Sequence, residues 1–150
     1  MLWQGGEPTL RGLGFFERLI ALCERFRRPT QRVRHALQTN GTLVTDEWAR
    51  FFADHNFLVG VSIDGPAPLH DAYRLNRGGR GTHAMVVRGW EALERAGVET
   101  NILCTVNART RTTGSTCTAT SATSLGPATC SSSPSWSACA RPTWPRPSAA

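Results

Sequence analysis

The chain has 150 residues, enough to bury one hydrophobic core, and its charge is unevenly spread. The first 106 residues hold 13 Arg and all 11 acidic residues, a net charge of +2, whereas the rest holds four Arg and no acidic residue. This pattern does not indicate a basic nucleic-acid-binding face, and the sequence shows neither a membrane span nor a signal peptide. We therefore expect a cytoplasmic protein whose partners are neither nucleic acid nor membrane.

Residues 1–106 alternate between strand and helix signals. A first strand ends near Trp3, and the later elements are a helix over 14–28, a strand over 33–37, a helix after Thr45, a strand over 57–63, a helix from Thr82 to Ala96 and a strand over 98–106. The run over 57–63 is almost entirely apolar, as expected for a strand covered on both faces. This order predicts a parallel α/β fold, either a doubly wound sheet or part of a βα barrel.

Polar clusters follow three of the predicted strands. They span residues 4–7, 38–41 and 62–65. In both parallel arrangements, ligands bind beyond the carboxyl ends of the strands. The three clusters therefore predict a binding site at this edge of the sheet.

The residue types in and near these clusters suit an amino acid moiety. Gly5 and Gly6 allow a ligand to approach the backbone closely, and Glu7 offers acceptors to an amine. Ser62 supplies a hydroxyl, and Arg74 is suited to bidentate carboxylate binding. Each feature alone is as readily a turn former or a solvated charge. Only their order on consecutive strands favours a site that holds both charged ends of one molecule.

Five cysteines occur, at positions 23, 104, 117, 130 and 139, and none forms a CxxC pair. Their spacing indicates neither a zinc site nor a redox motif. Cys23 lies on an apolar helix face and Cys104 in an apolar strand, so we expect both side chains to be buried.

Five sequence segments carry a specific resemblance to a known family. WQGGEP, LQTNGTL, FLVGVSIDGP, HDAYR and GVETNILCTVN are similar, in this order, to the radical S-adenosylmethionine core of anaerobic sulfatase-maturating enzymes, over residues 1 to about 107. The resemblance implies a partial βα barrel with a 4Fe–4S cluster at its open end, held by three cysteines of a CxxxCxxC loop. In that family the cluster cleaves S-adenosylmethionine, and the radical formed converts a Cys or Ser of an unfolded sulfatase to formylglycine.

The resemblance also implies roles for individual residues. Those that match the family's S-adenosylmethionine site are Gly5, Gly6 and Glu7 for the amino end, and Ser62 and Arg74 for the carboxylate. Those that match positions facing the peptide substrate are Gln4 and Gln38. His70 and Asp71 match the sequence pattern, but the resemblance implies no role for them.

Two departures from the family shape our expectations. The cluster cysteines belong upstream of Met1, and the catalytic carboxylate belongs to a C-terminal auxiliary-cluster domain that is absent. We therefore expect a barrel truncated at both ends, with no catalytic residue, no metal ligands and no bound cluster, and hence an inactive fragment. Its exposed sheet edges should make it marginally stable and prone to aggregation.

Residues 108–150 are rich in Ser, Thr, Ala and Pro, a composition that predicts disorder. We interpret them as a frameshift product that begins at Thr110, because one nucleotide restored there can give a reading frame with the helix and strand that the fold requires next. Two other interpretations of the whole chain stay open. One is a different peptide-modifying enzyme of the same superfamily, and the other is a non-catalytic binding module.

Overall fold

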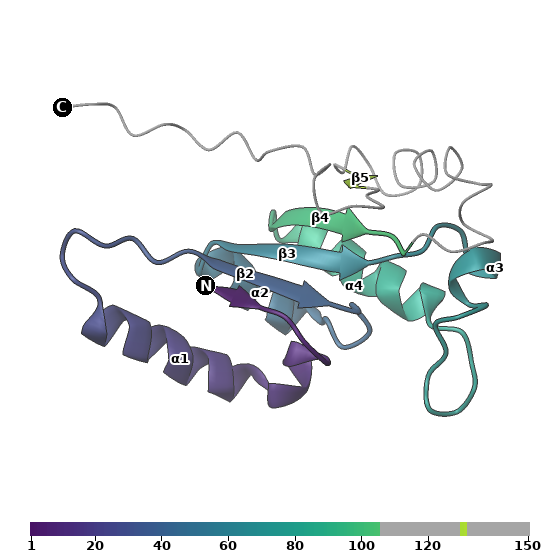
Figure 1. The fold of residues 1–150 in the computed structure, drawn as a ribbon, viewed down its shortest axis with the longest axis horizontal. Helices are drawn as coiled ribbons and strands as arrows, with labels where there is room; N and C mark the ends of the chain where they lie inside the picture. The colour runs from purple at the N-terminus through teal and green to yellow at the C-terminus, as the bar shows by residue number, and fades with distance from the viewer. Residues whose placement is uncertain (106–129, 132–150) are drawn as a thin grey trace.

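The structure, a computed structural model, describes residues 1–105 and the backbone of a two-residue strand at 130–131 (Figure 1). Its strands are β1 (Leu2–Trp3), β2 (His35–Thr39), β3 (Phe57–Ser62), β4 (Glu99–Leu103) and β5 (Cys130–Ser131). Its helices are the 3-10 helix η1 (Pro8–Arg11) and the α-helices α1 (Leu13–Phe26), α2 (Asp46–Asp54), α3 (Ala67–His70) and α4 (His83–Arg95). Apart from β5, the predictions of disorder and of a frameshift over 108–150 lie outside the described residues.

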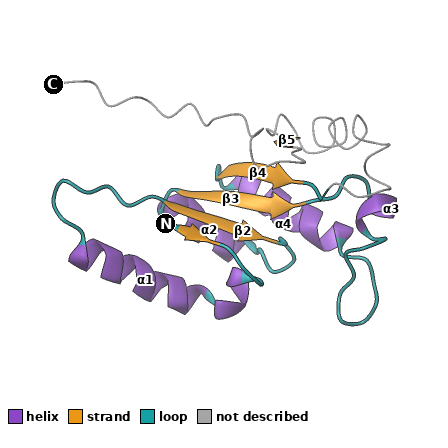
Figure 2. Cartoon of the chain, viewed as in Figure 1, coloured by secondary structure: helices purple, strands orange, loops and turns teal. Residues whose placement is uncertain are grey.

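The strands form one sheet in the order β1-β2-β3-β4-β5, and every neighbouring pair is parallel. Gln38, Gly60 and Asn101 lie in register across β2, β3 and β4. The strand arrows point toward the same end of the sheet (Figure 2). The loops that leave β1 to β4 therefore share one edge, which we call the carboxyl edge, and the opposite end is the amino edge.

The long helices pack on one face of the sheet. In Figure 2, α2 and α4 run behind the sheet and α1 lies beside β1. The buried core joins these helices to alternate strand residues, and its large members include Phe16, Leu37, Phe52, Phe57, Val59, Trp90 and Ile102. The strand residues between them, such as Gln38 and Ser62, are only partly buried and face the side that no described helix covers.

This single helix layer distinguishes between the two predicted folds. A doubly wound sheet has helices on both faces, whereas a βα barrel has them only on the outside. Together with the consecutive strand order, the layer makes the described residues an arc of a βα barrel and confirms the predicted α/β class. The expectation that the 57–63 strand is covered on both faces is wrong for the described residues, because Leu58 and Ser62 stay partly exposed.

Thr45 and Thr82 each precede a helix, but only Thr45 caps it. The Thr45 hydroxyl accepts a hydrogen bond from the Trp48 N–H at 3.4 Å and caps α2. Thr82 precedes α4 but makes no capping bond, because its hydroxyl donates to the Arg74 carbonyl instead. The Asp71 carboxylate accepts from the His83 N–H at 2.8 Å and takes over the cap, a placement that the helix dipole favours.

The two described cysteines are less buried than their sequence surroundings predict. Cys23 is partly exposed on α1, with its sulfur 3.6 Å from that of Met1. Cys104 is also partly exposed, because β4 ends at Leu103 and leaves this residue outside the strand. Among the described residues, no helix is both long and apolar enough to cross a bilayer.

Candidate functional site

The polar residues predicted to form a site meet at the carboxyl edge of the sheet. Hydrogen bonds link the loop after β1 to the end of β2, the end of β2 to that of β3, and the loop after β3 to that after β4. Glu7, Ser62 and Arg74 therefore lie along the same edge, as the order of the motifs predicts. The exposed Gln4 also lies at this edge, at the start of the loop after β1.

The Gly5–Gly6 loop presents open backbone at this edge. Both residues have positive φ angles, +112° and +58°, which residues other than glycine rarely adopt. A Cβ added at either position would meet no atom within 4 Å. The loop therefore uses glycine for its conformation, and both residues are exposed.

Glu7 holds this loop against the end of β2. Its Oε1 accepts from the Thr9 N–H at 3.1 Å, the Thr9 hydroxyl at 2.6 Å and the Thr39 hydroxyl at 2.8 Å. Its Oε2 accepts from the Asn40 N–H at 2.7 Å. A carboxylate has about four lone-pair sites, so most of its accepting capacity is used within the chain. The acceptors left for an amine are the Gly5 and Gly6 carbonyls and a remaining lone pair of Oε2.

Gln38 and Ser62 form a polar pair on neighbouring strands. The Gln38 Nε2 donates to the Ser62 Oγ at 3.2 Å. Gly60 makes room for this arrangement, because a Cβ there would lie 2.0 Å from the Gln38 Oε1 and 2.8 Å from the Asn101 Oδ1. Since the Ser62 oxygen already accepts from Gln38, its own hydroxyl hydrogen is left to donate to a ligand.

Arg74 is held by Asp64, a buried residue with 3% of its surface exposed. The Arg74 Nε and Nη2 donate to the two Asp64 oxygens at 2.5 and 3.2 Å, and Nη2 also lies 3.2 Å from the Thr105 hydroxyl. The Thr105 N–H donates to the Asp64 Oδ1 at 2.7 Å. The bidentate face expected to bind a ligand is therefore taken up by Asp64, and the guanidinium keeps Nη1 for other contacts.

His70 lies beneath this ion pair and is fully buried. Its Nδ1 accepts from the Asp64 N–H at 3.2 Å, and its Nε2 lies 3.1 Å from the Thr82 hydroxyl. Burial, followed by the charges of Arg74 and His83, lowers the pKa of His70 to about 4. The sequence pattern marks His70 and Asp71 but could not assign them these partners, which depend on how three loops fold together.

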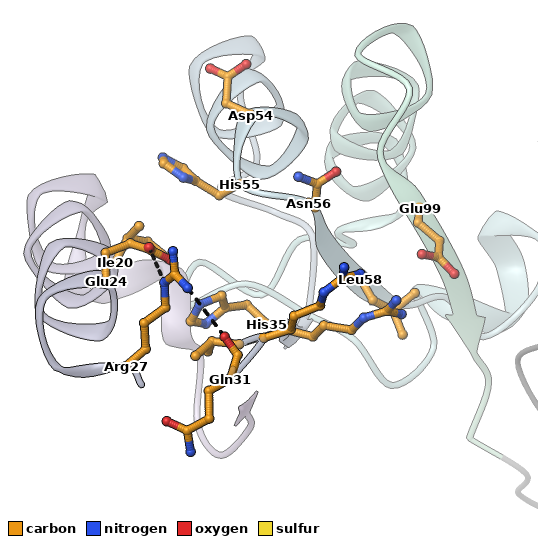
Figure 3. A pocket seen from close by; sticks show the side chains of 13 residues that line it. Ile20, Glu24, Arg27, Gln31, His35, Asp54, His55, Asn56, Leu58 and Glu99 are labelled. Carbon is orange, nitrogen blue, oxygen red and sulfur yellow. Dashed lines mark hydrogen bonds and ion pairs between the residues drawn. The ribbon is translucent and has the colours of Figure 1, made fainter. Parts of the chain in front are cut away.

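The described residues also enclose a hollow of about 810 Å³ at the amino edge (Figure 3). Its lining is of mixed charge and comes from the end of α1, the segment before β2, the end of α2 and the starts of β3 and β4. Arg27 and Glu24 pair across part of it at 2.5 Å. His35 also lines it, and burial, with the nearby positive charge of the N-terminus, lowers the pKa of this residue. In βα barrels this end serves stability, so we place the site at the carboxyl edge.

The fold and the polar edge define a class: an arc of a parallel βα barrel that carries ligand-binding groups at the carboxyl ends of its strands. The sequence pattern of the Radical SAM superfamily matches residues 1–109. The chain belongs to this superfamily.

Relatives and solved structures agree with this membership. A serine-type anaerobic sulfatase-maturating enzyme of Bacteroides thetaiotaomicron is 44% identical over 105 residues, which are 70% of this chain and 25% of that enzyme. A cysteine-type enzyme of Clostridium perfringens is 44% identical over 108 residues, 72% of this chain and 29% of the enzyme. A solved structure, native anSMEcpe with bound AdoMet and the Kp18Cys peptide, superposes with a TM-score of 0.79 at 39% identity, covering 81% of this chain and 33% of that one. The chain thus spans about a quarter to a third of the length of these proteins.

Proposed function

We propose that this chain binds S-adenosylmethionine at the carboxyl edge, as the cofactor-holding part of an enzyme that modifies a sulfatase peptide. The observation that carries the proposal is the convergence of acceptors and donors on one edge: exposed backbone at Gly5 and Gly6, and donor groups at Ser62 and Arg74. The solved relative with bound AdoMet has the same fold over this part of the chain. We also propose that the protein is cytoplasmic.

Each group has a chemical task in this proposal. The Gly5 and Gly6 carbonyls accept hydrogen bonds from the ammonium group of the cofactor, while Glu7 keeps their loop in place. The Ser62 hydroxyl and the Arg74 Nη1 donate to its carboxylate. Bound S-adenosylmethionine supplies the bond that the superfamily cleaves, and the described residues only bind and orient it.

A 4Fe–4S cluster does not fit the residues that the structure describes. Residues 1–105 contain no group of three or more His, Cys, Asp or Glu side chains that could hold a metal ion. Cys23 and Cys104 lie on α1 and after β4, on separate elements. We expect the 150-residue chain alone to bind S-adenosylmethionine without cleaving it.

The proposed substrate of the intact enzyme is a sulfatase peptide whose Cys or Ser becomes formylglycine. One serine-type and one cysteine-type relative are each 44% identical to this chain, so overall identity does not distinguish between the two targets. We propose that Gln4 and Gln38 face the peptide. For Gln38 this implies a double role, since its amide also fixes the Ser62 hydroxyl.

Titration of the 150-residue chain with S-adenosylmethionine, followed by amide NMR, tests the proposal. We expect shifts at Gly5, Gly6 and Ser62, and none at His35 or Glu99 on the amino edge. Ser62→Ala should weaken binding about tenfold through the loss of one charge-assisted hydrogen bond, whereas Glu99→Ala should leave it unchanged. Shifts confined to the amino edge, or none at millimolar ligand, would contradict the proposal.

A non-catalytic binding module is the second candidate, and the lack of a cluster site among the described residues favours it. Reconstitution of the chain with iron and sulfide separates the two. An absorbance band of a 4Fe–4S cluster, bound in stoichiometric amount, would argue for an enzyme. Binding of S-adenosylmethionine with no such band would argue for a module.

A further inference from the structure

Arg74 is fixed at both of its ends by one closed ring of hydrogen bonds. Its guanidinium binds Asp64, and the Asp64 N–H donates to His70. Its carbonyl accepts from the Thr82 hydroxyl at 2.9 Å, and Thr82 in turn lies 3.1 Å from His70. His70 is thus the middle residue of this ring, between Thr82 on the backbone side of Arg74 and Asp64 on its charged side.

The ring determines which nitrogen of His70 carries the hydrogen. The Thr82 hydroxyl has a single hydrogen, which it donates to the Arg74 carbonyl, so its oxygen must accept from the His70 Nε2. The Nδ1 must be unprotonated, because it accepts from the Asp64 N–H. Both contacts are satisfied only by the neutral imidazole protonated at Nε2. A second proton on Nδ1 would leave two donors, this N–H and the Asp64 N–H, facing each other without an acceptor.

We propose that neutral His70 is a positioning residue that fixes Arg74, so that the guanidinium presents only Nη1 to the carboxylate of the ligand. The ligand part of this proposal rests on the proposed function. Asp64 holds the other face of the guanidinium, and Thr105 closes the outer side. Arg74 therefore reaches a ligand end-on, through one nitrogen held in place before binding.

Burial, and after it the positive charges nearby, lowers the pKa of His70 and keeps it in this form at neutral pH. Arg74 and the His83 ring, whose centroid lies 5.4 Å away, disfavour a charge on His70, and the more weakly coupled Asp64 and Asp71 favour one. Burial outweighs the two carboxylates, which is why the pKa of His70 lies well below its ordinary value.

Nitrogen NMR of the 150-residue chain tests the ring without any ligand. We expect a pyridine-type signal for the His70 Nδ1, a pyrrole-type signal for Nε2, and a slowly exchanging Arg74 Nε–H. Two substitutions separate the contact of His70 with Asp64 from its contact with Thr82. In His70→Asn, the new side chain places an acceptor near the Nδ1 position, which faces Asp64. In His70→Gln, it places a donor near the Nε2 position, which faces Thr82. The Arg74 Nε–H signal should persist in His70→Asn and broaden or shift in His70→Gln. An Nδ1–H tautomer, or an Arg74 signal unaffected by both substitutions, would overturn the proposal.

Binding measurements test the consequence for the ligand. His70→Gln should bind S-adenosylmethionine about tenfold more weakly than the unaltered chain, and His70→Asn within about threefold. The loss should disappear with an analogue that lacks the carboxylate, because Arg74 contacts only that group. Equal weakening for both ligands would show a merely structural role and overturn the positioning proposal while leaving the proposed function intact. If the unaltered chain binds neither ligand, the proposed function fails, and the Arg74 signal alone decides the positioning.

Discussion

The two edges of the sheet differ in how their charged residues are held. At the carboxyl edge, Glu7 and Asp64 each accept several hydrogen bonds, and Asp64 is almost completely buried. At the amino edge a hollow of about 810 Å³ is also lined by charged residues, but the ion pair within it, Arg27–Glu24, has both side chains substantially exposed. The proposed site is therefore not at the larger opening. It is at the edge where polar groups are fixed before a ligand arrives.

The largest difference between the edges should follow removal of a carboxylate. Glu7→Ala leaves the N–H groups of Thr9 and Asn40 and the Thr39 hydroxyl without their acceptor, and should lower the free energy of unfolding by about 3 kcal/mol. The matched change at the amino edge, Glu99→Ala, should stay within about 0.5 kcal/mol. Urea denaturation followed by tryptophan fluorescence measures both. Equal losses would remove the distinction between the edges.

Mild acid should weaken the carboxyl edge through His70. Its folded pKa of about 4 lies below the ordinary 6.5, so the unfolded chain takes up a proton first as the pH falls. The stabilisation from neutral His70 is complete above pH 6.5 and is lost as the pH falls toward 4. By pH 5 the loss amounts to about 2 kcal/mol of unfolding free energy. The pKa of His35 is shifted in the same direction and adds to the slope.

His70→Gln isolates the contribution of His70 to this pH dependence. Unfolding free energies of both proteins at pH 7 and pH 5 should show a smaller decline in the variant, by about 2 kcal/mol. Parallel declines would mean that His70 does not titrate below its ordinary range in the folded chain.

A smaller effect should come from Gly60→Ala. The new Cβ would lie 2.0 Å from the Gln38 Oε1, so Gln38 must move, at a cost of about 1–2 kcal/mol. Gly14→Ala is the control: its Cβ would make only ordinary contacts, the nearest at 3.9 Å, and should stabilise α1 by about 0.5 kcal/mol. Thermal melts followed by circular dichroism compare the two. A neutral Gly60→Ala would show that the face around Gln38 is more adaptable than the structure indicates.

The smallest effect should be that of Arg27→Ala at the amino edge. Its partner Glu24 is more than half exposed, and surface ion pairs contribute little. We expect a change within about 0.5 kcal/mol in urea denaturation, and raised salt should make it smaller by screening the ion pair. A loss above 1 kcal/mol would mean that the hollow is held more firmly than its exposure implies.

The sequence predicted the long helices, the first four strands and the edge where the polar residues meet, because these depend on local patterns. It did not predict η1, α3 or β5. The apolar run over 57–63 and the Thr45 cap each act within a few residues of the chain. The choice between two parallel folds could not be predicted from periodicity alone, since it depends on which face the helices cover. The ion pair of Asp64 with Arg74 was missed for a related reason. In sequence, a buried Asp paired with an Arg cannot be distinguished from a turn-forming Asp and a solvated Arg, and only tertiary packing brings the two together.

Each link at the carboxyl edge joins one strand end to the next: Glu7 to Asn40, Gln38 to Ser62, and Asp64 to Thr105. The arrangement is a series of nearest-neighbour couplings, similar in its logic to a repeat protein. Such a series can be altered one link at a time, because replacing a side chain in one link leaves the hydrogen bonds of the other links in place. A barrel built in this way can diversify its chemistry strand by strand without losing its architecture.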